Sequence, residues 1–318
     1  MPVALPVLVA WLVVVAVWST TPLFLHFSTL AFPASLAGGL RMAVAALVLL
    51  LVLAALGRGL PREPRARLAG LAMLPGVFGS MYLSYLAAQR IPTGLISVVF
   101  GLSPVLSALF ARWWLDEPAL GLRRGVAVTI ALCGLALVMG VETLATGTLD
   151  VIGVACVCAA TLLFSASGVA VKRIGQGFDP MTQTAGALVL SLPLYALAWL
   201  AEGRPQPAAG QADFPLAVMA ILYLAVIGSV LGFVCYYHVL QHMSAAGAAL
   251  ITVVTPVFAL ALGALLNGEH FTGLMLAGAA LVLAGVAGFL FEPAGLRRVL
   301  RRRSGFTQTD NSCAGHRS

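Results

Sequence analysis

Residues 76–121 read GVFGSMYLSYLAAQRIPTGLISVVFGLSPVLSALFARWWLDEPALG, and residues 228–273 repeat their pattern. Six residues recur 152 positions further on, in the pairs Gly76 and Gly228, Tyr85 and Tyr237, Gln89 and Gln241, Pro104 and Pro256, Glu117 and Glu269, and Gly121 and Gly273. Six matches at one offset indicate an internal duplication, and a duplication determines the architecture before any other feature does. The sequence therefore predicts a chain built from two related halves.

The composition is that of a membrane protein. Of the 318 residues, 61% are hydrophobic and 9% are charged, whereas soluble domains carry about 25% charged residues. A helix needs roughly 20 apolar residues to cross the hydrocarbon core. Runs of about this length lie at 4–24, 33–57, 68–89, 91–115, 119–141, 151–171, 181–201, 214–241, 244–266 and 271–291. We therefore predict an all-α membrane protein with ten transmembrane helices.

Positive charge is distributed unevenly over the connections between these runs. If the C-terminal arginines are cytoplasmic, fifteen Lys and Arg residues lie inside, while Arg90 and Arg204 lie outside. This bias predicts an inner or plasma membrane protein with both termini in the cytoplasm. The net charge of +7 comes mostly from Arg297, Arg298, Arg301, Arg302 and Arg303. Such a cluster after the last apolar run indicates topology or contact with anionic lipids, and we expect no nucleic-acid partner.

The two predicted halves are residues 1–141 and 151–291, and each contains five of the apolar runs. Because five is odd, the second half must enter the membrane in the opposite sense to the first. The prediction is therefore two inverted five-helix repeats, followed by a basic cytoplasmic tail at 292–318 that we expect to be disordered. Inverted repeats are a recurrent construction of secondary transporters that work by alternating access.

Several short motifs lie in or next to the predicted spans. They are Trp18-Ser19 with Pro22, Leu40-Arg41-Met42, Ser103-Pro104 followed by Glu117, Thr255-Pro256 followed by Glu269, and Gly134 and Gly285 in the fifth span of each half. Over about residues 1–291 the chain resembles the EamA family of the drug/metabolite transporter superfamily. The resemblance implies an inverted five-plus-five fold, a central substrate cavity and export of small metabolites, often amino acids or related compounds. One departure is that Leu188 lies opposite Arg41 when Pro33 is aligned with Pro180.

Arg41 is the clearest ionised residue within a predicted span, about eight residues into the run at 33–57. A charge in the middle of a bilayer costs several kcal/mol unless it is paired or hydrated. One interpretation is that Arg41 binds an anionic group of a substrate, such as a carboxylate. The other is structural, with the side chain reaching the interface or donating to backbone carbonyls at a helix break.

The paired prolines Pro104 and Pro256 each remove one backbone hydrogen bond and are expected to kink their helices. Ser103 and Thr255 precede them, and Ser97 and Thr252 lie close by in the sequence. Each kinked helix therefore gains a small polar face. This face either lines a substrate cavity or joins neighbouring helices, since Ser and Thr also bridge helices structurally.

Six further residues complete the candidate cavity lining: Trp18, Ser80, Tyr82, Ser165, Tyr236 and His238. Uncharged donors with aromatic walls suit an amphipathic organic solute. Trp18 has an alternative interpretation as a lipid-facing side chain. His238 titrates near neutral pH and is a candidate proton carrier, but a solvated or hydrogen-bonded histidine near a span end is the alternative.

The function predicted from the sequence is a secondary transporter that exports small amphipathic metabolites. No P-loop is present, which argues against ATP as the energy source. A membrane-embedded enzyme, or a protein that handles lipids or drugs without exporting a solute, is the alternative, but the acidic residues are scattered and form no catalytic set. We expect a small-molecule substrate, contact with membrane lipids, no cofactor or metal, and a monomer or homodimer.

Overall fold

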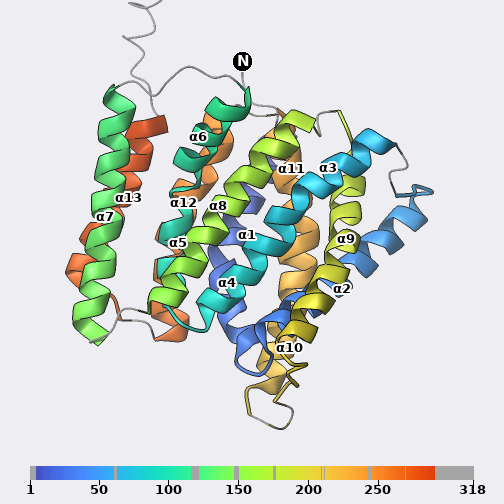
Figure 1. Cartoon of the computed structure of the whole chain (residues 1–318), viewed down its shortest axis with the longest axis horizontal. Helices are drawn as coiled ribbons and strands as arrows, with labels where there is room; N and C mark the ends of the chain where they lie inside the picture. Colours follow the sequence, from blue (N-terminus) through green and yellow to red (C-terminus); the bar gives the residue numbers. More distant parts are fainter. Residues whose placement is uncertain are drawn as a thin grey trace, which may run out of the picture.

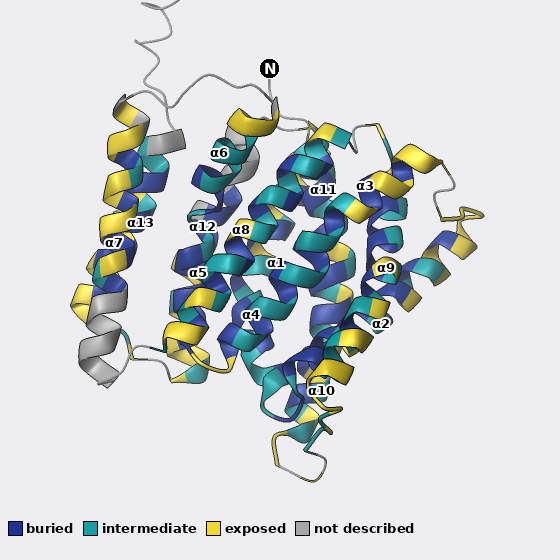
Figure 2. Cartoon of the chain, viewed as in Figure 1, coloured by how far each residue is buried: buried dark blue, intermediate teal, exposed yellow. Residues whose placement is uncertain are grey.

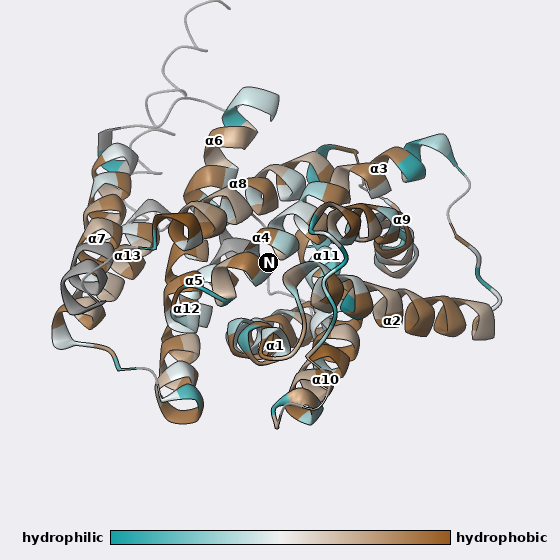
Figure 3. Cartoon of the chain, turned by 60° about the horizontal axis from the view of Figure 1, so that its bottom comes forward, coloured by the Kyte–Doolittle hydropathy of each residue, from teal (hydrophilic) through white to brown (hydrophobic). Residues whose placement is uncertain are grey.

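The computed structural model describes residues 5–60, 63–115, 122–146, 150–174, 177–208, 210, 212–242, 245–268 and 270–290. Every regular element within these ranges is helical (Figure 1), so the all-α prediction is confirmed. Figure 1 shows the helices side by side, with the N-terminal end of α1 at the top of the bundle. Most of the hydrophilic residues gather at helix ends and connecting loops (Figure 3).

Within the described residues, seven helices are long and apolar enough to cross a membrane. Four of them are α1 (Leu5–Thr29), α2 (Ala34–Ala55), α8 (Val151–Ile174) and α9 (Pro180–Ala201). The other three are composite: Pro64–Ala88 contains α3 (Pro64–Leu74), η1 (Pro75–Ser80) and α4 (Met81–Ala88), Thr93–Trp114 contains α5 (Thr93–Phe100) and most of α6 (Ser103–Leu115), and Phe214–His242 contains α10 (Phe214–Tyr223), η2 (Leu224–Leu231) and α11 (Gly232–His242).

Three shorter apolar stretches complete the bundle. They are Gly125–Val138 within α7 (Leu122–Thr146), Val254–Asn267 within α12 (Ala245–Asn267), and Gly273–Gly288 within α13 (Gly273–Leu290). Figure 2 shows buried residues on the faces that the helices turn towards one another and exposed residues on the outer faces. The outer faces carry large apolar side chains, among them Leu51 at 62% exposure and Leu197 at 60%. A hydrocarbon solvent accounts for this pattern, because soluble proteins rarely expose contiguous apolar surface.

Local sequence explains both ends of α9 and the C-terminal end of α2. Asp179 precedes Pro180 and accepts a 3.0 Å hydrogen bond from the Thr182 backbone N–H, as an N-cap residue does. At the far end of α9, Gly203 has a φ of 83° and Arg204 N donates to Trp199 O. This is a Schellman ending, which needs a residue in the left-handed region and favours glycine. α2 ends in the same way at Gly57.

Two helices contain a π-helical segment at matching places in the duplicated pattern. Gly76 lies in η1 and Gly228 lies in η2, and these two glycines are one of the pairs separated by 152 residues. A π segment widens the helix locally and leaves backbone carbonyls in need of partners. Ser167 of α8 supplies one such partner, because its hydroxyl donates to Ala72 O at 2.9 Å.

The two predicted proline kinks differ in the structure. At Pro104 the helix is interrupted, since α5 ends at Phe100 and α6 starts at Ser103. At Pro256 the helix α12 continues through the proline. Gly101 lies in the interruption, and a Cβ built there would be 3.7 Å from the Pro256 Cγ atom. The interruption of one helix therefore packs against the proline of the other.

α7 and α13 lie side by side at one edge of the bundle (Figure 1). Their backbones approach closely because glycines face each other: a Cβ at Gly134 would lie 2.7 Å from Gly278 O. Small residues at helix contacts are how membrane helices pack closely. Gly125, on the same helix as Gly134, makes no such contact and faces open space.

Candidate functional site

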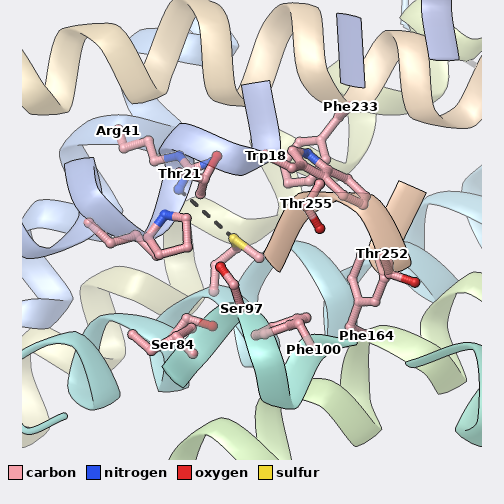
Figure 4. A pocket seen from close by; sticks show the side chains of 14 residues that line it. Trp18, Thr21, Arg41, Ser84, Ser97, Phe100, Phe164, Phe233, Thr252 and Thr255 are labelled. Carbon is pink, nitrogen blue, oxygen red and sulfur yellow. Dashed lines mark hydrogen bonds between the residues drawn. The ribbon is translucent and has the colours of Figure 1, made fainter. Parts of the chain in front are cut away.

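A central cavity lies among α1, α2, α4, α5, α8, α11 and α12 (Figure 4). About 620 Å³ of space not filled by atoms lies within it, including its open mouth. The side chains that line it are Trp18, Thr21, Pro22, Leu25, Arg41, Met81, Ser84, Ile96, Ser97, Phe100, Phe164, Phe233, Thr252 and Thr255. Most of this lining is apolar or aromatic, and it contains a single charged residue.

That charged residue is Arg41, whose side chain is 1% exposed. Its Nε donates to Ser229 Oγ at 2.8 Å, and its Nη1 contacts Met81 Sδ at 3.9 Å. Gly228 makes room for the guanidinium group, because a Cβ there would lie 3.2 Å from Nη2. No carboxylate in the described part of the chain pairs with Arg41. The guanidinium group is therefore held in place without being neutralised.

Aromatic rings form the opposite part of the cavity wall. Trp18 contacts Phe164 at 5.5 Å between ring centroids, and Phe164 contacts Phe100 at 5.9 Å. Tyr236 lies behind this wall, 4.7 Å from Trp18 and 5.6 Å from Phe164. Aromatic pairs at these separations stabilise each other beyond their buried area. The wall is consequently a preorganised apolar surface.

Hydroxyl groups are distributed around the lining. Ser84 donates to Ser80 O at 2.7 Å and Thr21 donates to Val17 O at 2.9 Å, so each of these hydroxyls retains acceptor capacity only. Ser97 and Thr255 are nearly buried, and neither hydroxyl has a hydrogen-bond partner among the described residues. These two hydroxyls can both donate to and accept from a bound solute.

The structure brings five of the predicted site residues into the cavity lining: Trp18, Arg41, Ser97, Thr252 and Thr255. Tyr236 supports the aromatic wall from behind. The remaining residues lie elsewhere. Ser165 donates to Ser103 O at 3.2 Å and joins α8 to α6, and Pro104 and Pro256 are buried in helix packing.

Ser80, Tyr82 and His238 also lie outside the lining. The Ser80 hydroxyl is buried and has no partner in the part of the chain that the structure describes. His238 is partly exposed, and its ring lies 4.3 Å from that of His242. Glu117, Glu269 and the tail at 292–318 fall outside the described residues.

The lining residues that the sequence analysis missed follow a helical period. Thr21, Pro22 and Leu25 stand three, four and seven positions after Trp18, and Phe100 stands three after Ser97. Residues at these spacings share one helix face. Extending each predicted residue along its helix face would therefore have found them, whereas Met81 has no such anchor in the predicted set.

Glu202 forms a second polar centre that the sequence did not indicate. It caps the C-terminal end of α9 and accepts hydrogen bonds from Ser35 at the start of α2 and from Tyr82 of α4. An acidic residue at this end of a helix opposes the helix dipole, so another interaction must favour it. The two hydroxyl donors provide that interaction and tie three helices together at one end of the bundle.

Two ion pairs connect loops at the helix ends. Arg58 lies 3.7 Å from Asp179, and Arg90 lies 3.3 Å from Asp150. Asp150 also accepts a 2.7 Å hydrogen bond from the backbone N–H of Gly153. This backbone hydrogen bond, together with Arg90, holds the pKa of the Asp150 carboxyl below its ordinary value.

The fold and the cavity define a class: a polytopic α-helical membrane protein with an internal cavity. The sequence model of the EamA-like transporter family matches residues 5–140 and again residues 151–291. The chain therefore belongs to the EamA-like transporter family, whose members are transporters and not enzymes. This confirms the resemblance noted in the sequence.

Curated relatives share about a quarter of their residues with this chain. A "Probable amino-acid metabolite efflux pump" of Salmonella typhimurium is 25% identical, covering 86% of this chain and 91% of the relative. A "Probable terminal-alkyne amino-acid exporter" of Streptantibioticus cattleyicolor is 29% identical over 77% of this chain and 80% of the relative. A solved crystal structure of a protein aligns with a TM-score of 0.64 at 20% identity, over 92% of this chain and 97% of that chain. The latter likeness is one of fold alone.

Proposed function

We propose that this protein is a secondary transporter that exports small amphipathic metabolites, such as amino acids or related compounds, by alternating access. The observation that carries the proposal is the central cavity, to which both matched segments contribute. Trp18, Arg41 and Ser97 come from the first segment, whereas Phe164 and Thr255 come from the second. A site at the junction of two repeats is where transporters of this construction bind their substrates.

The proposal includes ten transmembrane helices arranged as two inverted repeats, residues 1–141 and 151–291. Seven long apolar helices and three shorter apolar stretches support this number. The double match to the family supports the division into repeats. The π segments η1 and η2 at equivalent positions support it further, because equivalent irregularities are expected in duplicated units.

The proposed orientation places both termini in the cytoplasm. The two ion pairs support the assignment of the loops. Arg58 and Asp179 belong to loops that the charge distribution predicts inside, and Arg90 and Asp150 belong to loops predicted outside. Each pair thus joins two loops on one predicted side, as the proposed order of crossings requires.

The choice of amino acids or related compounds rests on the printed names of two relatives, an amino-acid metabolite efflux pump and an amino-acid exporter. The cavity supports the same choice, because apolar rings, hydroxyls and one cation suit a solute with a polar head and an apolar body. We place the whole transport path within one chain, so that a dimer is not required for activity.

Counterflow in proteoliposomes tests the proposed function. Vesicles loaded with an unlabelled solute should accumulate labelled solute transiently against its gradient, since a carrier exchanges one molecule for another. A channel would equilibrate the label without accumulation, and an enzyme would convert it to product. Replacing Thr255 by Leu should abolish accumulation by filling the cavity. Replacing the outward-facing Leu51 by Phe should leave it unchanged.

A further inference from the structure

Arg41 has more donors than partners. A guanidinium group carries five N–H donors. Arg41 donates to Ser229 Oγ and contacts Met81 Sδ, and the buried Tyr85 hydroxyl is a further acceptor beside it. A thioether is a weak acceptor. Several donors of a buried cation therefore remain for a partner that enters the cavity. Burying an ion without such a partner is costly.

The charge around the cavity has one sign. As far as the structure describes the chain, the lining contains Arg41 and no acidic residue, and the two described ion pairs lie at helix ends, away from the cavity. A bound cation would meet an unneutralised guanidinium group and no carboxylate. A bound anion would instead neutralise the guanidinium group, and planar carboxylates match its geometry through two parallel hydrogen bonds.

The rest of the lining indicates the chemical character of the ligand's body. In the view of Figure 4, Arg41 lies on the left and the rings of Trp18 and Phe164 lie towards the right. Ser97 and Thr255 lie between, and their hydroxyls have no partner among the described residues. A ligand with a negative head at Arg41 and a flat apolar body against the rings would satisfy both ends of the cavity at once.

We propose that Arg41 binds the carboxylate of the substrate and that the cavity takes organic monocarboxylates with an apolar or aromatic body, without requiring an amino group. This proposal rests on the proposed function, because it takes the cavity to be the transport site. Ser229 acts as a positioning residue: its hydroxyl holds Nε, so that the outer edge of the guanidinium group points to the ligand. Transport of amino acids then depends on their carboxylate and not on their ammonium group.

Equilibrium binding to the purified full-length protein tests the proposal with three probes of one shape: 3-phenylpropanoate, 3-phenylpropanol and 3-phenylpropylamine. The wild-type protein should bind the acid at least about tenfold more tightly than the alcohol, and the amine least tightly, as expected for a charge-assisted hydrogen bond. Arg41→Gln should remove the advantage of the acid and leave binding of the alcohol unchanged. Unchanged alcohol binding also shows that the variant is folded.

Two further variants test the proposal if Arg41→Gln does not fold. Arg41→Lys should retain part of the preference for the acid, because it keeps the charge but loses the planar fork. Ser229→Ala should weaken acid binding severalfold, whereas Ser191→Ala should not. Ser191 is a matched control, since it is also buried and its hydroxyl donates only to Leu188 O of its own helix.

The proposal is overturned if the wild-type protein binds amine and acid equally, or if Arg41→Gln binds the acid as tightly as the wild type does. The proposed function is tested separately by counterflow of the same three probes. Preferential acid binding without counterflow would contradict transport and support the carboxylate site. Counterflow of all three probes at equal rates would support transport and contradict the carboxylate site.

Discussion

Arg41 of α2 donates a 2.8 Å hydrogen bond from Nε to the hydroxyl of Ser229 in η2, a residue 188 positions further along the chain. The contact joins the two segments that match the family, at the wall of the cavity between them. It also explains how a buried cation is kept in one orientation, because a bond from a charged donor is worth about 1.5–3 kcal/mol. The π segment and Gly228 give the guanidinium group the space that this orientation needs.

Gly228→Ala should impair transport of carboxylates more than it impairs folding. The new Cβ would lie 3.2 Å from Arg41 Nη2, so the end of the arginine side chain must shift and its aim at the ligand is lost. We expect a severalfold rise in KM for carboxylates with thermal stability nearly unchanged. Gly125→Ala is the control, because Gly125 faces open space, and an unchanged KM in the Gly228 variant would contradict the role of this glycine.

Gly134→Ala should destabilise the α7 and α13 pair. The added Cβ would meet Gly278 O and Val282 N at 2.7 Å each, and backbone atoms cannot move aside as a flexible side chain can. Overpacking of this kind costs about 1–3 kcal/mol, which should lower the unfolding temperature of the detergent-purified protein. Gly288→Ala is the comparison, since its Cβ would make an ordinary 3.7 Å contact with Ala127. Equal unfolding temperatures for the two variants would contradict the close contact.

Glu202→Gln and Tyr82→Phe should have coupled effects. The Glu202 carboxylate accepts hydrogen bonds from both Tyr82 and Ser35. A glutamine side chain has one acceptor oxygen, and its amide NH2 group can only donate. A double-mutant cycle on thermal stability should give a coupling of about 0.5–3 kcal/mol, as expected for residues in direct contact. Additive effects of the two substitutions would show that the hydrogen bond contributes nothing measurable.

Asp150 should make stability dependent on acid pH. Because the pKa of Asp150 is lowered in the folded state, first by the Gly153 backbone N–H and then by Arg90, the charged carboxylate favours folding. This contribution is complete above the ordinary value of 3.8 and is lost as the pH falls through the lower folded value. The unfolding temperature, measured between about pH 2.5 and 7, should therefore fall less steeply on acidification in Asp150→Asn than in the wild type. Parallel curves would contradict this assignment.

Apolar runs in the sequence predicted most helix bounds to within a few residues, and one of the two largest differences has a clear cause. The first run was predicted to end at residue 24, but α1 continues to Thr29. Polar residues lower the hydropathy of this last part. Their hydroxyls donate to carbonyls of the same helix, as Ser28 does to Leu25 O and Thr29 does to His26 O. Such a helix extends beyond the last residue of the apolar run from which it was predicted.

The cavity was harder to predict than the helices. Arg41 and Pro256 lie in helices that line the cavity, α2 and α12, but a helix face cannot be oriented from one residue. Tyr82 and Tyr236 illustrate this, because both lie in apolar helices but their partners differ, being Glu202 for Tyr82 and the aromatic wall for Tyr236. Both contacts join residues more than a hundred positions apart, and only the packing of the helices determines them.

Thiol labelling at Ser97 tests alternating access most directly. In a chain whose five native cysteines are replaced by alanine, Ser97→Cys should react with a small membrane-impermeant reagent applied from either side of the membrane. A transported solute in excess should lower the rate from both sides, because Ser97 lines the cavity. Reaction from one side only under every solute gradient, or no protection by any transported solute, would contradict the account.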